Sequence, residues 1–271
     1  METRMRKTGW GRGPRERRGA AVLAVLAAVA LAAAFTDPAA AVDRGREAAA
    51  QDSAEILLRR MSGRLAASPG LTVDAVRQVD AALLEGRAVP ESASIHLELR
   101  RPDRLYVLST GTDLERHLYF DGQNVTVYDA VRKLYAIEPV QGTIDDLIRT
   151  LDERYGFVPP LAEFLANDPW TFIEPQVATA RLTGTQVING RQCRQLAVTG
   201  EVANATIWLT PRTDLPCGLI ATFTQVEGNP RVRAGFSNWN LRAEPDDSRF
   251  RFTPPPGARR IPMPPVPETE G

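Results

Sequence analysis

The sequence predicts an α+β fold in which about ten antiparallel strands carry helices grouped on one side. The clearest evidence is the segment 119–129, YFDGQNVTVYD, where Asp121-Gly122 can supply the positive φ angles of a tight hairpin between good strand residues. Further strand patterns recur with turns every 8–12 residues or so, and an amphipathic helix precedes them. These observations indicate one domain.

The first 41 residues are expected to be a secretory signal. Basic residues crowd positions 4–18, an uncharged apolar run follows from Ala20 to Phe35, and 39–41 form an Ala-x-Ala site, so we expect cleavage after Ala41. A retained membrane anchor is the alternative, although the run is short for a span of roughly 20 residues. The chain has 33 basic and 33 acidic residues, and without its first residues the domain is mildly acidic. This balance argues against recruitment of nucleic acid or of an anionic membrane surface.

The mature chain is predicted to start with an amphipathic helix from Arg44 to Ala67, because apolar residues recur there at three- and four-residue spacing. A first run of strands follows. The segment Leu71–Ala81 has a mixed period, whereas Ser94–Arg100 alternates cleanly between apolar and polar residues. The remaining strands of this run are expected at Arg104–Ser109, Glu115–Phe120, Asn124–Asp129 and Lys133–Ile137.

A helical insertion is predicted between two runs of strands. Thr143 can cap a helix that ends at Tyr155-Gly156. A second short helix is expected over 161–165 and is closed by 167–169, Asn-Asp-Pro. The second run of strands is expected at Ala178–Val187, Arg191–Thr199, Ala205–Thr210, Gly218–Glu227 and Arg231–Arg242. The predicted domain covers 42–258, and a proline-rich tail, 259–271, is expected to be disordered.

The two cysteines, Cys193 and Cys217, both lie in the exported part of the chain. In an oxidising compartment such a pair is expected to form a disulfide, which would stabilise the fold by roughly 3 kcal/mol in the chain-entropy model. Two buried free thiols are the alternative. A redox site is disfavoured because the sequence has no Cys-x-x-Cys motif.

No catalytic, metal-binding or cofactor-binding residue is predicted. The two histidines, His96 and His117, are interpreted as exposed strand residues, because neither has an Asp, Glu or Cys at the repeated spacing that is typical of a metal site. The sequence contains no Gly-x-Ser-x-Gly elbow and no glycine loop that would cradle phosphate. The acidic pairs 145–146 and 152–153 are interpreted as a solvated helix face. An enzyme is therefore disfavoured.

The insertion is unusually apolar for a connection between strands. One interpretation is that its side chains fill the core between sheet and helices. The functional interpretation is that part of it is a lid over a cavity that accepts an acyl chain or an apolar segment of a partner. The ligand or lid candidates are Phe157, Leu161, Phe164, Leu165, Trp170 and Phe172.

The chain resembles the lipoprotein-carrier (LolA/LolB-like) fold. The residues that carry this resemblance are the run 101–105, RPDRL, the hairpin at 119–129, and the closing segment 251–258. More narrowly, 142–146, 155–156, 160–165, 190–196, 207–209 and 215–216 resemble a bacterial family of predicted periplasmic proteins of unknown function. The resemblance covers nearly all of the mature chain. It implies a strongly curved, unclosed antiparallel β half-barrel with helices packed on or plugging its concave face, and it carries over no activity.

The sequence as a whole predicts a non-enzymatic protein of the bacterial cell envelope, periplasmic or otherwise exported. We expect a monomer that binds a lipid, a lipidated protein or another apolar ligand in a half-barrel cavity, and that meets the membrane only through its signal or transiently. The alternative is a periplasmic interaction or sensor module whose own helices plug the cavity. A third class, an envelope hydrolase, would need a polar cluster in the concavity that the sequence does not assemble.

Overall fold

The computed structural model of the chain describes residues 53–84, 91–156 and 161–263. The predicted signal, residues 1–41, and the first part of the predicted N-terminal helix lie outside the described residues. Within the described ranges, no helix has both the length and the apolar character needed to cross a membrane.

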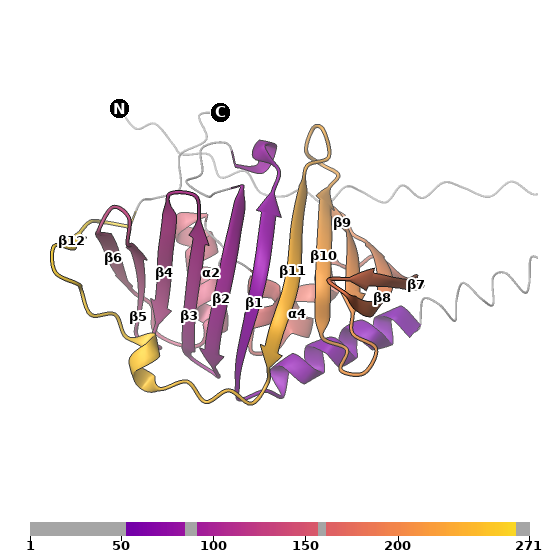
Figure 1. Cartoon of the computed structure of the whole chain (residues 1–271), viewed down its shortest axis with the longest axis horizontal. Coiled ribbons are helices and arrows are strands. Elements are labelled where there is room, and N and C mark those ends of the chain that lie inside the picture. Colours follow the sequence, from indigo (N-terminus) through magenta and orange to yellow (C-terminus); the bar gives the residue numbers. More distant parts are fainter. Residues whose placement is uncertain (1–52, 85–90, 157–160, 264–271) are drawn as a thin grey trace, which may run out of the picture.

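A single 12-stranded sheet forms the body of the protein, in the order β12-β6-β5-β4-β3-β2-β1-β11-β10-β9-β8-β7. It is strongly curved and does not close into a barrel, because β12 and β7 form separate edges (Figure 1). The predicted α+β half-barrel is therefore confirmed. The strands are β1 (Gly70–Val79), β2 (Ser92–Arg100), β3 (Arg104–Gly111), β4 (Leu114–Phe120), β5 (Asn124–Asp129), β6 (Leu134–Pro139), β7 (Thr179–Ile188), β8 (Arg191–Thr199), β9 (Ala203–Leu209), β10 (Pro216–Phe223), β11 (Arg231–Asn240) and β12 (Arg259–Arg260).

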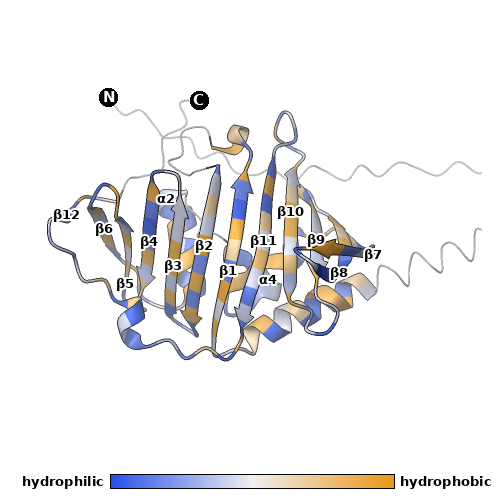
Figure 2. Ribbon diagram, in the orientation of Figure 1, coloured by the Kyte–Doolittle hydropathy of each residue, from blue (hydrophilic) through white to orange (hydrophobic). Residues whose placement is uncertain are grey.

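Two antiparallel meanders make up this sheet, and they meet where β1 pairs with β11. One meander runs from β1 to β6 and the other from β7 to β11, and only β12 pairs in parallel, with β6. Hydrophobic and hydrophilic residues alternate along most strands (Figure 2). Because successive side chains of a strand point to opposite faces, one face of the sheet is apolar and concave and the other is largely polar and convex.

The helices pack on the concave face; in Figure 1 those of the insertion lie behind the sheet, and the N-terminal helix runs along its lower end. They are an N-terminal helix (53–66), α2 (Ile144–Tyr155), α3 (Ala162–Leu165) and α4 (Pro169–Ile173), with short 3-10 turns η1 (Ala81–Leu83), η2 (Glu174–Gln176) and η3 (Asp247–Phe250). Leu58, Met61 and Leu65 of the N-terminal helix and Leu147 and Leu151 of α2 are fully buried in one cluster with the inward residues of the strands. This cluster is the core of the protein.

The predicted cap of α2 is confirmed. The Thr143 hydroxyl accepts a hydrogen bond from the Asp146 backbone N–H at 3.3 Å, and the Asp146 carboxylate accepts one from the Thr143 N–H at 2.9 Å. The hydrogen bonds that the carboxylate accepts from Thr143 lower the pKa of Asp146. This reciprocal pair satisfies two backbone donors that the first turn of a helix leaves free.

Several boundaries differ from the predicted ones by a few residues, and three of the differences change how a segment is assigned. The Asn-Asp-Pro segment that was expected to close the insertion instead starts α4, because the Asp168 carboxylate accepts a hydrogen bond from the Trp170 N–H at 3.0 Å and Pro169 occupies the first turn. Strand β10 ends at Phe223, so residues 224–227 belong to the following turn. The predicted tail starts with an ordered part, since Arg259 and Arg260 form β12; residues 264–271 lie outside the described part.

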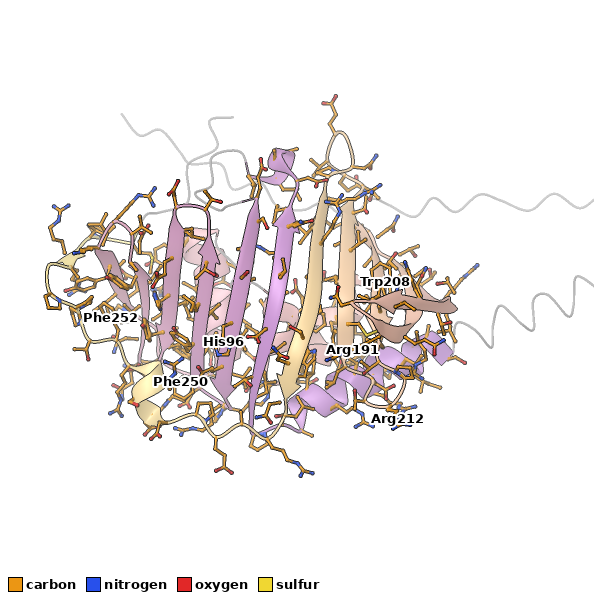
Figure 3. The ribbon with its side chains drawn as sticks, viewed as in Figure 1. His96, Arg191, Trp208, Arg212, Phe250 and Phe252 are labelled. Carbon is orange, nitrogen blue, oxygen red and sulfur yellow. A yellow bond between two sulfur atoms is a disulfide. The ribbon has the colours of Figure 1, made fainter. Side chains whose placement is uncertain are left out.

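The C-terminal strap, residues 241–263, crosses the convex face of the first meander (Figure 1). Arg249 pairs with Glu98 of β2, and its guanidinium lies 4.4 Å from the centre of the Tyr106 ring. Phe252 packs against three tyrosines of β4, β5 and β6, with ring centres 5.1–5.4 Å apart. Figure 3 shows Phe250 and Phe252 on this face. The strap therefore covers part of the outer surface, while residues near its two ends, Leu241 and Met263, pack against the core cluster.

A second, smaller cluster of buried residues lies on the convex side of the meander that runs from β7 to β11. The predicted disulfide between Cys193 of β8 and Cys217 of β10 is present, and it packs against Trp208 of β9. Ile188 and Ile220 complete the cluster. The disulfide thus links two strands across the one that lies between them.

Replacement of both cysteines by alanine is expected to lower the free energy of unfolding by about 3 kcal/mol, because the 24-residue separation sets the size of the loop that the disulfide closes in the unfolded chain. Urea unfolding of the oxidised wild type and of the double variant measures this difference. A reductant should destabilise the wild type and leave the double variant unchanged. Equal stability of the two oxidised proteins would contradict the prediction.

Candidate functional site

The insertion lies against the concave face, where the sequence predicted it. Phe164 and Leu165 of α3 are buried in the core, with exposed fractions of 5% and 2%. Leu161, Trp170 and Phe172 are partly buried and pack against the same cluster. Phe157, the sixth ligand or lid candidate, lies outside the described residues. The structure thus gathers five of the six candidates on one face of the sheet.

Phe164 packs directly on the sheet. Its ring meets that of Phe236, an inward residue of β11, edge to face with ring centres 5.5 Å apart. The Phe236 ring also stacks near Trp239, whose indole N–H donates a hydrogen bond to the Pro216 carbonyl at 2.9 Å. Phe164 is therefore held against β11 by rings that are themselves fixed.

Arg101 ties the insertion to the rest of the fold. Its guanidinium donates hydrogen bonds to the carbonyls of Leu165 and Ala166, which end α3, and to the Leu65 carbonyl at 3.2 Å, which ends the N-terminal helix. Burial lowers the pKa of Arg101 to about 10. One cation thereby satisfies the last carbonyls of two helices that meet on the concave face.

The N-terminal helix and α4 are joined by a second arginine. The Arg59 guanidinium lies 4.3 Å from the centre of the Trp170 ring and donates hydrogen bonds to Glu55 and Glu174 at 3.0 Å each. Its neighbour Arg60 pairs at 2.7 Å with Asp214, a fully buried carboxylate that also pairs with Arg194 of β8. These contacts fix the helix across the second meander.

The helices do not cover the whole concave face. Beyond them, the inward side chains of β9, β10 and β11 are only half-buried, and we call this set the apolar strip. The strand register places its members next to one another: Val232 pairs with Ala221, which pairs with Ala205, and Phe223 pairs with Ala203. The strip consists of Ala203, Ala205, Leu219, Ala221, Phe223 and Val232.

Small side chains make up half of the apolar strip. Three of its six members are alanines, and two of these, Ala205 and Ala221, stand opposite each other on neighbouring strands. Larger residues, Leu219 and Phe223, stand on either side of Ala221 along the same face of β10. The strip is thus a band of half-buried apolar side chains in which Ala221 lies between two bulky residues of its own strand.

Glu163 faces the solvent between the buried residues of α3. Its side chain is exposed, yet desolvation by the surrounding protein raises its pKa.

The two histidines lie on the convex face and take no part in the concave one. His96 is half-exposed, as predicted, and lies between two carboxylates: its Nδ1 is 2.6 Å from Asp74 and its Nε2 is 3.2 Å from Glu98 (Figure 3). His117 was expected to be exposed, but its side chain is only 15% accessible. It stacks on Tyr119 and contacts the Tyr106 hydroxyl at 3.0 Å, so aromatic neighbours cover it. In the part of the chain that the structure describes, no three potential ligands are grouped so that they could hold a metal ion.

Sequence reasoning found the insertion but missed the apolar strip. Alanine and a single phenylalanine in β9 and β10 give a weak periodic signal, and only the register shows that they are neighbours. The alternation of strands was the available signal, since it places Ala203, Ala205 and Ile207 on one face.

Several solved structures are similar to this chain at low sequence identity. An uncharacterised conserved protein from Thermus thermophilus is 12% identical, with a TM-score of 0.46 over 77% of this chain and 98% of that one. LprF from Mycobacterium bovis is 13% identical, with a TM-score of 0.44 over 77% and 98%. A LolA superfamily protein from Nitrosomonas europaea is 10% identical, with a TM-score of 0.34 over 73% and 97%.

No curated protein matches the sequence. One family model does, from residue 54 to residue 263, which is most of the chain and nearly all of the described part. The match starts in the N-terminal helix and ends in the C-terminal strap, so it includes the whole sheet, the helical insertion and both cysteines. The chain belongs to the DUF2092 family of predicted periplasmic proteins.

Proposed function

We propose that this protein binds the acyl chain of a lipid or lipidated protein on the concave face of its half-barrel, without catalysis. The observation that carries the proposal is the apolar strip, which leaves apolar side chains of three adjacent strands half-exposed beside the helices. Apolar surface of this kind costs free energy when it is exposed to water. A ligand that covers the surface removes this cost. The function fits a periplasmic protein, because acyl chains need shelter in an aqueous compartment.

The arrangement of the strip across neighbouring strands favours a chain-like ligand. An acyl chain is flexible and narrow, and it can lie across the alanines of β9 and β10 between Leu219 and Phe223. We further propose that the half-buried members of the insertion, Leu161, Trp170 and Phe172, contact the ligand, whereas Phe164 and Leu165 anchor the insertion. Convergent polar groups around a substrate bond are the mark of a hydrolase, and the strip itself has none among the described residues.

Replacement of Ala221 by tryptophan is expected to weaken binding of a fluorescent fatty acid at least tenfold, because the indole would cover the alanines on which the acyl chain is proposed to lie. The matched control is Thr222→Trp, which places the same side chain on the opposite face of β10 and should leave binding unchanged. Fluorescence titration of both variants and of the wild type measures the effect. Equal binding by the three proteins would place the ligand elsewhere, and a wild type that binds no fatty acid would contradict the proposed function.

A second function has one observation in its favour. Phe164 and Leu165 lie in the core, so the insertion fills part of the concavity with the protein's own side chains. A periplasmic interaction or sensor module would be built in this way and would bind a protein partner through the rim of the sheet. Native mass spectrometry of protein taken from an envelope fraction separates the two functions: a lipid that leaves on denaturation supports lipid binding, and a bare mass supports the module.

A further inference from the structure

Arg77 of β1 lies on the apolar face of the sheet. Leu71, Val73, Ala75 and Val79 share its face and are buried, whereas Val76 and Gln78 point to the convex side and are exposed. The register with β2 runs without a bulge from Gly70 to Gln78, so the alternation holds at Arg77. A guanidinium thus stands on the concave face, where the neighbouring inward positions are apolar.

No group of the described residues compensates this charge. Among the residues that the structure describes, none gives Arg77 a hydrogen bond or an ion pair, and its Nε is buried without a partner. The pKa of Arg77 lies below its ordinary value because the side chain is desolvated, and no neighbouring carboxylate opposes that shift. A half-buried cation without a counter-ion costs free energy, so Arg77 does not serve the stability of the fold.

The residues that pair with Arg77 are small. It pairs with Ala93 of β2 on one side and with Ala234 of β11 on the other, so both flanking side chains are single methyl groups. The next inward residue along β1 is Val79, which pairs with Val232 of the apolar strip. Ala221 of the strip is two strands from β1, about 10 Å at the usual strand spacing. Arg77 therefore lies on the same face as the apolar strip, beside its β11 end.

We propose that Arg77 binds the oxyanion head group of a lipid whose acyl chain lies along the apolar strip. This inference rests on the proposed function and names the class of its ligand: an acyl lipid with a carboxylate or phosphate head group. The planar guanidinium suits such groups, because it can donate two parallel hydrogen bonds to two oxygens of the same anion. The ligand supplies the counter-ion that the described residues do not provide.

The test compares three twelve-carbon ligands that share a chain and differ in head group: dodecanoate, dodecyl phosphate and neutral dodecanol, each below its critical micelle concentration. Calorimetric titration of the wild type should show both anions binding about tenfold or more tightly than dodecanol, the scale of one charge-assisted hydrogen-bonded contact. Arg77→Met keeps the aliphatic part of the side chain and should remove this preference while dodecanol binding stays the same. Thermal melting of Arg77→Met should give an equal or higher Tm.

Arg116→Met is the matched control, because Arg116 is also a concave-facing arginine but stands opposite Asp129 in the register. It should keep the preference for anions. If the wild type binds all three ligands equally and Arg77→Met changes nothing, the role of Arg77 is refuted and the proposed function stands. Loss of all binding together with a lower Tm in Arg77→Met would make Arg77 a structural residue and overturn the inference. No binding of any ligand by the wild type would refute the proposed function itself.

Discussion

Trp208→Asp is expected to prevent folding, with a loss of more than about 5 kcal/mol in the free energy of unfolding. Trp208 lies in β9, an interior strand of the sheet, and only 8% of it is exposed. Its ring packs on the Cys193–Cys217 disulfide, and its indole N–H donates hydrogen bonds to the side chains of Gln186 and Gln195 at 2.9 and 3.3 Å. Aspartate would bury a carboxylate there and leave two amide oxygens without a donor.

Two variants separate the effect of the introduced carboxylate from the effect of losing the indole. Trp208→Phe keeps an aromatic ring but removes the N–H, so it should destabilise the protein by a smaller amount, about 1–3 kcal/mol. Thr206→Asp places the same carboxylate on the same face of the same strand at a half-buried position and should be tolerated better. Chemical unfolding followed by circular dichroism measures all three. A Trp208→Asp protein that melts like the wild type would show that the convex cluster contributes nothing to the fold.

Phe164→Ala is expected to lower the free energy of unfolding by about 3–5 kcal/mol, the usual range when a buried aromatic ring is removed. The reason is its contact with Phe236 and its place in the core beside Leu165. The same variant decides between the two roles considered for the insertion. A core residue affects stability above all, whereas a lid residue affects ligand uptake with little change in stability.

The measurement for Phe164→Ala therefore has two parts, urea unfolding and titration with a fluorescent fatty acid. Phe172→Ala is the comparison, since Phe172 belongs to the same insertion and is only partly buried. We expect Phe172→Ala to cost less stability and to weaken binding more. A stable Phe164→Ala protein with weak binding would reverse this assignment and make Phe164 part of a lid.

The fold could be predicted from the sequence where local signals agree. The Asp121-Gly122 turn and the clean alternation of Ser94–Arg100 identified strands that the structure confirms, and Thr143 marked the start of α2. The α+β class followed from these elements. The family resemblance added the curvature and the open edges, which depend on contacts between distant residues and leave little trace in any one segment.

Strand β1 shows why the site could not be predicted. Its period looked mixed because Arg77 points inward and Val76, 53% exposed, points outward. Recognition of a strand from its sequence periodicity depends on apolar side chains being buried and charged ones being exposed. Arg77 and Val76 both depart from this rule, so the strand pattern was weak. The apolar strip posed a similar problem, because Ala221 and Ala205 become neighbours only through the pairing of β9 with β10.

The meeting of the two meanders has a consequence for how the chain reaches its folded state. Strand β1 pairs with β2, which follows it closely in the sequence, but its other partner is β11, near the end of the domain. A chain that crosses a membrane from its N-terminus would present β1 long before β11 arrives, and contacts between such distant segments form slowly. During that interval β1 is an open edge with unpaired backbone groups, ready to pair with another chain. The amount of correctly folded protein would therefore depend on how well the edge of β1 is protected during export. A chaperone could protect it, or the N-terminal helix could cover it quickly.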